Sequence, residues 1–178
     1  TPRVPDMKRK SFREAECPVA RTLDAIGDWW SLLIVRDAFD GIRRFSAFQQ
    51  NLGIARGMLS TRLRDLVEAE VLALAPASDG SAYQEYVLTK KGRDLFLVIV
   101  AMRQWGEDHL YRADERHSVL VETATGAPVG RLRLQAEDGR RLGWAETCVS
   151  GAKRDTSAAD EPKGRRASPA GSNPPRQL

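Results

Sequence analysis

The sequence predicts a mainly α-helical fold with a small β-hairpin wing, plus a small β-rich C-terminal extension. Three observations predict it. Helical segments follow one another between residues 18 and 70, two short strand-like runs flank Asp79-Gly80, and a long apolar helix comes after them. The order helix, helix, short helix, tight turn, longer helix, hairpin, helix is that of a winged helix-turn-helix.

The first two helices are indicated by apolar spacing and by their end residues. From Pro18 to Ile26 apolar residues recur at helical intervals, and Gly27 ends this segment. Asp28 is suited to cap a second helix that runs to about Asp40. The nearly continuous apolar face of this second helix predicts burial on most of its sides.

The next helix is short. Ser46 is its expected cap, and it runs to Leu52 with Phe45 and Phe48 facing inward. Gly53 then breaks it, which gives the tight turn of a helix-turn-helix.

A longer helix is predicted over residues 56–70. Its apolar residues share one face at intervals of three and four, and its polar residues take the opposite face. The apolar set is Leu59, Leu63 and Leu66, flanked by Met58 and Val67. The polar set is Arg56, Ser60, Thr61 and Arg64.

The hairpin and the last helix follow. Residues 71–75 and 82–89 are strand-like runs on either side of the Asp79-Gly80 turn. Thr89 is the expected cap of a long helix over 90–111, whose stretch 95–102 is apolar all round. Because one core needs only one apolar stripe, the surplus predicts that a second copy of the chain covers the other face.

Composition limits the class of protein. The chain has 178 residues with two cysteines and two histidines, too few for a disulfide framework or a structural zinc site, so no metal or other cofactor is expected. It contains no run of 18 apolar residues that would indicate a membrane span, and no membrane association is expected. We expect the reducing cytoplasm as its compartment.

The sequence divides into four regions. Residues 1–16 form a basic N-terminal arm, and 17–112 form the predicted DNA-binding and dimerisation domain. Residues 113–149 alternate β-prone runs with turns and predict a three-stranded meander that packs on the last helix, with an effector site beside Trp144 as the alternative. Residues 150–178 contain too little apolar surface to fold and predict a disordered tail.

A family resemblance rests on three sequence segments, in the same order as in the family, between Cys17 and Leu110. They are CPVARTLDAIGDWWSLLIVRDAFDGIRRFSAFQQNLGIARGMLSTRLRDLVEAEVL, YVLTKKGRDL and RQWGEDHL. They resemble the HxlR family, which belongs to the MarR-like winged-helix regulators. The resemblance implies a homodimeric bacterial transcription regulator that pairs through its N- and C-terminal helices. We expect a repressor that binds a pseudo-palindromic operator in double-stranded DNA.

The resemblance makes the helix over 56–70 the recognition helix. Its N-terminal residues would meet base edges in the major groove, where arginine reads guanine. The predicted contacts there are Arg56, Ser60, Thr61 and Arg64, with Arg62 nearer the core and either on a phosphate or paired with Glu68 or Asp65.

Further contacts are expected to hold the DNA backbone. Two arginines, Arg43 and Arg44, precede the short helix. They are expected to bind phosphates of the DNA backbone, unless they form surface ion pairs. The wing loop carries Asp79 and no basic residue, so a minor-groove arginine is not expected. Lys90 and Lys91, just past the hairpin, are expected to contact phosphates instead, with the N-terminal arm as a further contributor.

Cys17 is the candidate redox-sensing residue. It precedes Pro18, at the start of the first helix, where the helix dipole favours a thiolate. The resemblance places it where some relatives carry a sensor cysteine, and an oxidant or a small molecule is the expected effector. The alternative is an inert residue at the dimer interface. Trp29, Trp30 and Trp105 are expected in the core or in the dimer contact.

The sequence bears on two other classes of protein. A winged helix that binds protein and has lost specific DNA recognition would explain the acidic wing and the slightly acidic body. An enzyme is not expected, because the sequence has no Cys-His-Asp set, phosphate-binding loop or paired-carboxylate motif.

Overall fold

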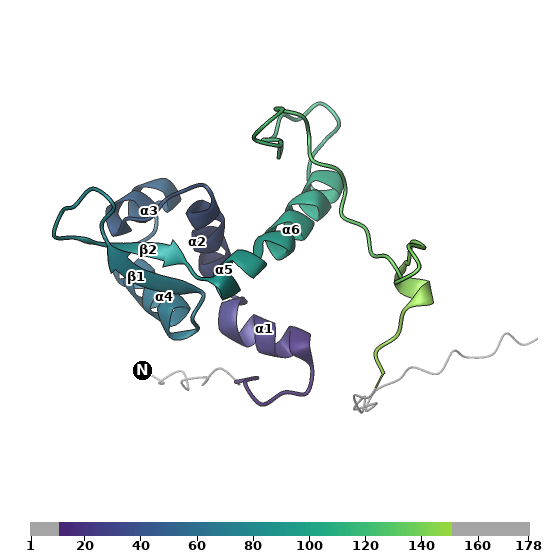
Figure 1. Cartoon of the computed structure of the whole chain (residues 1–178), viewed down its shortest axis with the longest axis horizontal. Coiled ribbons are helices and arrows are strands. Elements are labelled where there is room, and N and C mark those ends of the chain that lie inside the picture. The colour runs from purple at the N-terminus through teal and green to yellow at the C-terminus, as the bar shows by residue number, and fades with distance from the viewer. Residues whose placement is uncertain (1–10, 151–178) are drawn as a thin grey trace, which may run out of the picture. The chain divides into compact units, whose positions relative to one another are not determined.

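The computed structural model describes residues 11–150, so most of the predicted arm and almost all of the predicted tail lie outside the described residues. The elements are α1 (Pro18–Ile26), α2 (Trp29–Phe39), α3 (Phe45–Leu52), α4 (Arg56–Glu68), β1 (Leu72–Pro76), β2 (Gln84–Leu88), α5 (Lys90–Asp94), α6 (Phe96–His109) and the 3-10 helix η1 (Trp144–Glu146) (Figure 1). The expected mainly α-helical fold with a hairpin wing is confirmed.

The core lies between α2, α3, α4 and the start of the hairpin. The three α4 leucines face this core because residues spaced by three and four share one side of a helix. The side chains that are almost completely buried there are Ile34, Val35, Phe48, Leu59, Leu63, Leu66 and Leu72. Burial of this set fixes α4 against the rest of the domain, so its other face is presented outward.

The start of α2 is capped as the sequence predicts. The Asp28 carboxylate accepts a hydrogen bond from the Ser31 amide at 3.1 Å, and the Ser31 hydroxyl donates to the same carboxylate. Ser31 is itself buried, so Asp28 satisfies a polar group inside the domain. The expected burial of α2 on most sides holds only in part, since Trp29 remains 72% exposed.

The helix-turn-helix differs from the prediction at two boundaries. Residue Arg44, with an extended backbone, is the N-cap of α3, so Ser46 lies inside the helix and the predicted Ser46 cap is wrong. Gly53 ends α3 in the left-handed conformation with φ of 62°, as expected of a helix-ending glycine. The α4 helix ends at Glu68 because Glu70 adopts a φ of 57° and turns the chain toward β1.

The predicted single helix over 90–111 is two helices. Thr89 caps α5, where its hydroxyl accepts a hydrogen bond from the Gly92 amide at 3.0 Å. The regular i to i−4 hydrogen bonding of the helix is interrupted at Leu95. The Leu95 amide donates to the Gly92 carbonyl, three residues back, and α6 then begins at Phe96. A Cβ on Gly92 would lie 2.1 Å from the Val71 carbonyl oxygen, so α5 approaches the start of the wing more closely than any other residue allows.

The wing is a two-stranded antiparallel hairpin. Leu72 pairs with Leu88 at its base and Pro76 with Gln84 toward its tip. A third segment joins it, because the Tyr86 amide donates to the Arg43 carbonyl at 2.8 Å. The segment before α3 is therefore fixed to the wing by the main chain.

The extension after α6 is not the three-stranded meander that the sequence predicts. It contains two isolated antiparallel bridges, Val121 with Pro128 and Gln135 with Arg141, and then η1. Almost all of its side chains are exposed, so no core forms that would extend the bridges into strands. Its contacts with α6 are polar: Arg131 forms ion pairs with Glu107 and Asp108.

None of the helices between residues 11 and 150 is both long and apolar enough to cross a membrane.

Candidate nucleic-acid interface

The outward face of α4 is polar and exposed along its N-terminal half. Arg56, Ser60 and Arg64 are exposed, and Thr61 is half-buried with its hydroxyl donating to the Gly57 carbonyl at 3.1 Å. Ser60 lies four residues after Arg56, and Arg64 follows Ser60 and Thr61 by four and three residues, on a helix whose leucines face the core. The structure therefore brings four of the predicted contacts onto one surface.

The two arginines on this face keep donors available. The Arg56 guanidinium lies over the Phe45 ring, 5.6 Å from its centroid, and no carboxylate of the described chain is within ion-pair distance of it. Arg64 is 64% exposed, and its Nε lies 3.8 Å from the Glu68 carboxylate. Exposed pairs at such distances are weak, so Arg64 can exchange Glu68 for another acceptor.

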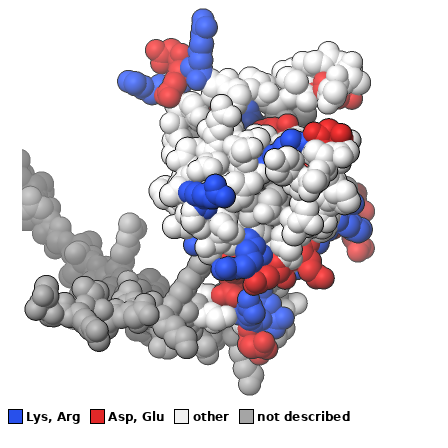
Figure 2. Space-filling model, turned by 90° about the vertical axis from the view of Figure 1, so that its left-hand side faces the viewer, with Lys and Arg blue, Asp and Glu red and all other residues white. Residues whose placement is uncertain are grey.

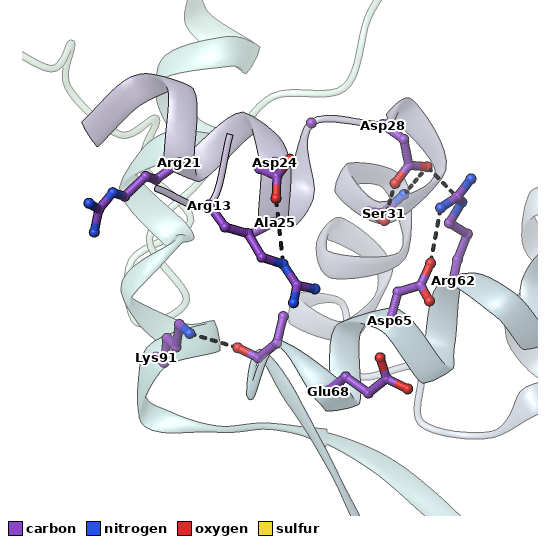
Figure 3. Close-up of a pocket in the computed structure, with 12 residues that line it drawn as sticks. Arg13, Arg21, Asp24, Ala25, Asp28, Ser31, Arg62, Asp65, Glu68 and Lys91 are labelled. Carbon is purple, nitrogen blue, oxygen red and sulfur yellow. Dashed lines mark hydrogen bonds and ion pairs between the residues drawn. The ribbon is translucent and has the colours of Figure 1, made fainter. Parts of the chain in front are cut away.

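Arg62 lies on a different side of α4. Its side chain is only 25% exposed and forms ion pairs with Asp28 at 3.2 Å and with Asp65 at 3.0 Å (Figure 3). The predicted pairing with Asp65 is confirmed, and Glu68 pairs with Arg64 instead. Arg62 thus connects the recognition helix to the capping residue of α2.

Arg43 and Arg44 are engaged by the wing. Arg43 lies 3.9 Å from Glu85, while Arg44 pairs with Asp79 at the turn and lies 3.7 Å from Glu85. Glu85 is 4% exposed and also accepts a hydrogen bond from the Ser78 hydroxyl at 3.1 Å. The alternative of surface ion pairs is therefore what the structure shows for both arginines.

The charged pairs of the wing are reflected in pKa values. Hydrogen bonding to Asp79 raises the pKa of Arg44 above its usual value. The pKa of Asp79 is lowered to about 2, first by the hydroxyl and amide of Ser81 and then by Arg44. Both groups are fully charged at neutral pH.

The two lysines after the hairpin also have partners within the chain. Lys90 pairs with Asp94 at 3.0 Å, and the Lys91 ammonium donates to the Ala69 carbonyl at 2.7 Å, just beyond the end of α4. Lys91 lines a cleft of about 500 Å³ together with residues of α1, α2 and α4 (Figure 3). Lys91 therefore lies near the C-terminal end of the recognition helix, away from Arg56.

Charge on the side of the hairpin and α3 is interleaved. Figure 2 shows separate groups of lysine and arginine on that side, several of them beside acidic residues, around a broad uncharged area. No continuous basic stripe crosses the face shown. Of the predicted contacts, Arg44 pairs with Asp79 and Arg64 with Glu68.

A second surface is apolar. On α6, Val98, Met102 and Trp105 follow one another at intervals of four and three and are 39%, 50% and 58% exposed. On α1, Val19 and Leu23 are more than half exposed. We call these five residues the apolar stripe. Several exposed apolar side chains on a few elements of a small domain are typical of protein interfaces.

The tryptophans are divided between core and surface. Trp30 packs against the core and its ring lies 5.5 Å from that of Trp29, whereas Trp29 and Trp105 are mostly exposed. Core packing is confirmed for Trp30 alone.

Cys17 is exposed and is the N-cap residue of α1, as the position before Pro18 predicts. The Arg21 guanidinium, one turn away, donates to the Ala15 carbonyl and not to the sulfur. Cys148 is also free and exposed. Between residues 11 and 150 no three His, Cys, Asp or Glu side chains gather in a way that could hold a metal ion.

Sequence reasoning missed Glu85 and the partner of Asp79. Tyr86 and Leu88 pack against the core, so alternation places Glu85 on the other side of the hairpin and gave no signal that it would be buried. The Arg44–Asp79 pair joins residues 35 apart in sequence, for which no local pattern exists.

These features define a winged helix-turn-helix protein in which the second helix of the helix-turn-helix, α4, presents a polar face. The chain belongs to the HxlR-like helix-turn-helix family, whose model matches residues 25–114. A Mycobacterium tuberculosis protein named the uncharacterized HTH-type transcriptional regulator Rv3095 is 48% identical over 96 residues, which cover 54% of this chain and 61% of the relative. This chain therefore spans less than two thirds of that relative.

Two solved structures are similar as well. The crystal structure of PA1607, a candidate transcription factor, matches with a TM-score of 0.75 and 55% identity, over 78% of this chain and 97% of that one. PA1374 from Pseudomonas aeruginosa, another candidate transcription factor, matches with a TM-score of 0.54 and 39% identity, over 79% and 96% of the two chains.

Proposed function

We propose that this chain is a DNA-binding transcriptional regulator, a repressor that binds a pseudo-palindromic operator as a homodimer in the bacterial cytoplasm. The observation that carries the proposal is the outward face of α4. Its leucines are buried at 0% exposure, and its N-terminal half presents Arg56, Ser60 and Arg64 to solvent. Family membership and relatives named HTH-type transcriptional regulators support the same function.

In this proposal the N-terminal half of α4 enters the major groove. Arg56 and Arg64 donate to guanine O6 and N7 or to phosphates, and the Ser60 and Thr61 hydroxyls make less selective contacts. Arg44 supplies a backbone contact beside the groove, while Arg43 stays paired with Glu85. Arg62 and Lys91 position α4, because their charged groups are held by Asp28 and Ala69 on the side of the cleft.

The homodimer is supported by the apolar stripe. Val98, Met102 and Trp105 repeat at the spacing of a helix-packing seam, and the polar α6 residues Arg103 and Glu107 form an ion pair on another side of the helix. A second copy that packs against this stripe would remove its apolar surface from water. It would also place two recognition helices on successive major grooves.

The proposed effector is an oxidant that acts on Cys17. The sulfur is exposed at the N-cap of α1, the helix that carries Val19 and Leu23 of the apolar stripe. Oxidation there would change the charge and size of a group beside the proposed dimer contact.

The test of DNA recognition uses the full chain and two duplexes of equal length. One carries the DNA directly upstream of its own gene and the other a scrambled version, and binding is measured over a salt series. We expect about a thousandfold or greater preference for the upstream duplex and a steep loss of affinity with salt. An Arg140→Ala variant, altered on the extension, is the matched control for Arg64→Ala.

Failure of the proposal has a clear form. If the chain binds neither duplex at low salt, in the presence of a thiol reductant, DNA recognition is contradicted and a protein-interaction module is indicated. If the Arg64→Ala and Arg140→Ala variants lose affinity equally, the α4 face is not the DNA-binding surface.

A further inference from the structure

The wing holds Arg44 in a cluster of two positive and two negative side chains. Arg44 pairs with Asp79 at the turn of the hairpin and lies 3.7 Å from Glu85 on β2, while Arg43 reaches the other Glu85 oxygen at 3.9 Å. The two carboxylates differ in environment. Glu85 is 6% exposed at its side chain and Asp79 is 53% exposed.

We propose that Asp79 is an intramolecular substitute for a DNA phosphate, which occupies the Arg44 guanidinium in the free protein and is displaced when a duplex binds. The inference rests on the proposed DNA-binding function and assigns a role to the acidic wing tip. Glu85 is the permanent support of the two arginines, and Asp79 is the exchangeable ligand.

The exchange is supported by the chemistry of the acceptors. A guanidinium presents several donors in one plane, which fit the two oxygens of a carboxylate and of a phosphate alike. Arg44 stands at the N-cap of α3, the first helix of the helix-turn-helix, which crosses the DNA backbone in this class of fold. A phosphate at that place would compete with Asp79 for the same donors.

The position of Asp79 allows it to leave. It lies in the hairpin turn beside Gly80, which has a φ of 74°, and its carboxylate also accepts a hydrogen bond from the Ser81 amide at 3.1 Å. When Arg44 moves to a phosphate, Ser81 and water still satisfy the carboxylate. Buried Glu85, in contrast, is expected to keep Arg43 as its partner when Arg44 moves, because a buried carboxylate without a charged partner would be costly.

Salt concentration, and not pH, sets the strength of this contact in the physiological range. Because the pKa of Asp79 is lowered to about 2, the carboxylate stays charged throughout the neutral and mildly acidic range. The pair is exposed, so dissolved ions screen it as they screen the contact with phosphate.

The test is a double-mutant cycle on DNA binding with the full chain. Asp79→Asn keeps the oxygen that accepts from Ser81 and removes the charge that holds Arg44. We expect the Kd for the upstream duplex to tighten about three- to fivefold at low salt, and this gain to shrink as the salt concentration rises, because dissolved ions already weaken the Arg44–Asp79 pair of the parent. In an Arg44→Gln background the same Asp79→Asn change should have no effect.

Asp138→Asn is the matched control. Asp138 is likewise an exposed carboxylate in a glycine-containing turn, its pKa is lowered by an arginine, Arg140, and it lies on the extension. The Asp138→Asn substitution removes one negative charge, as Asp79→Asn does, and we expect its Kd to stay within about twofold of that of the parent. A gain as large as that of Asp79→Asn would show a general charge effect and overturn the proposal.

Three other outcomes overturn it. They are no gain in Asp79→Asn, a gain that persists with Arg44→Gln, and an Arg44 guanidinium NMR signal in the free protein that Asp79→Asn does not alter. The last readout needs no DNA, so it separates failure of this inference from failure of the proposed function.

Discussion

Helices α4 and α6 are nearly equal in length, with 13 and 14 residues, but they expose opposite kinds of surface. In α4, Leu59, Leu63 and Leu66 are completely buried and the exposed face is polar. In α6, only Val100 is buried and most of the apolar residues are exposed. In the proposed function this difference matches two kinds of partner, a charged polymer for α4 and a second apolar surface for α6.

The first prediction tests the buried side of the comparison and has the largest expected effect. Leu63→Ala should lower the free energy of unfolding by about 2–5 kcal/mol, because it removes buried methyl groups and leaves a cavity. Urea unfolding followed by circular dichroism measures it. Ser60→Ala, exposed on the same helix, is the control and should change the free energy by less than about 0.5 kcal/mol. Equal losses would contradict the assigned faces of α4.

The second prediction tests the exposed side of α6. Trp105→Glu should weaken the homodimer about thirtyfold or more, because a charge replaces an aromatic side chain in the apolar stripe. Analytical ultracentrifugation over a concentration series measures the dimer Kd. Val119→Glu is the matched control, since Val119 is 57% exposed on the extension and Trp105 is 58% exposed. A parent protein that is monomeric throughout the series would exclude the proposed dimer.

The third prediction separates two arginines of α4. Arg56→Ala should weaken operator binding about tenfold, the usual loss for one base-reading arginine, without changing the unfolding free energy. Arg62→Ala should lower stability by about 1 kcal/mol or more, because Asp28 and Asp65 lose their partner. Binding and urea unfolding are measured on both variants. If Arg62→Ala alone abolished discrimination between duplexes, the division of α4 would be wrong.

The smallest expected effect on binding is that of Cys17→Ser. The serine is nearly isosteric at an exposed N-cap, so the DNA Kd should stay within about twofold of the parent. Any release from DNA by diamide should be lost in this variant. A diamide response that persists in Cys17→Ser and disappears in Cys148→Ser would assign it to the other exposed cysteine.

The fold was predictable wherever one stretch of chain contains its own signal. The Asp28 cap, the Gly53 turn, the α4 leucines and the Thr89 cap all depend on residues within four positions of one another. The extension was predicted poorly, because turn residues and β-prone runs look the same whether or not a core forms beneath them. There the exposed side chains supply no burial to stabilise strands.

The sequence predicts which residues lie on the candidate site better than it predicts the ion-pair partners of those residues. The helical spacing of Arg56, Ser60 and Arg64 places them together, and the structure does so. That Arg44 is held by Asp79, and Arg62 by Asp28, depends on contacts between segments more than thirty residues apart. Such pairing is set by the tertiary fold and leaves no periodic trace in the sequence.

The interruption at Leu95 has a geometric consequence for an operator. The α5 helix is fixed to the wing by the contact of Gly92 with Val71, whereas α6 carries most of the apolar stripe. In the proposed homodimer, the angle between α5 and α6 at Leu95 would therefore determine the distance between the two recognition helices. The number of base pairs between the operator half-sites would then depend on this angle.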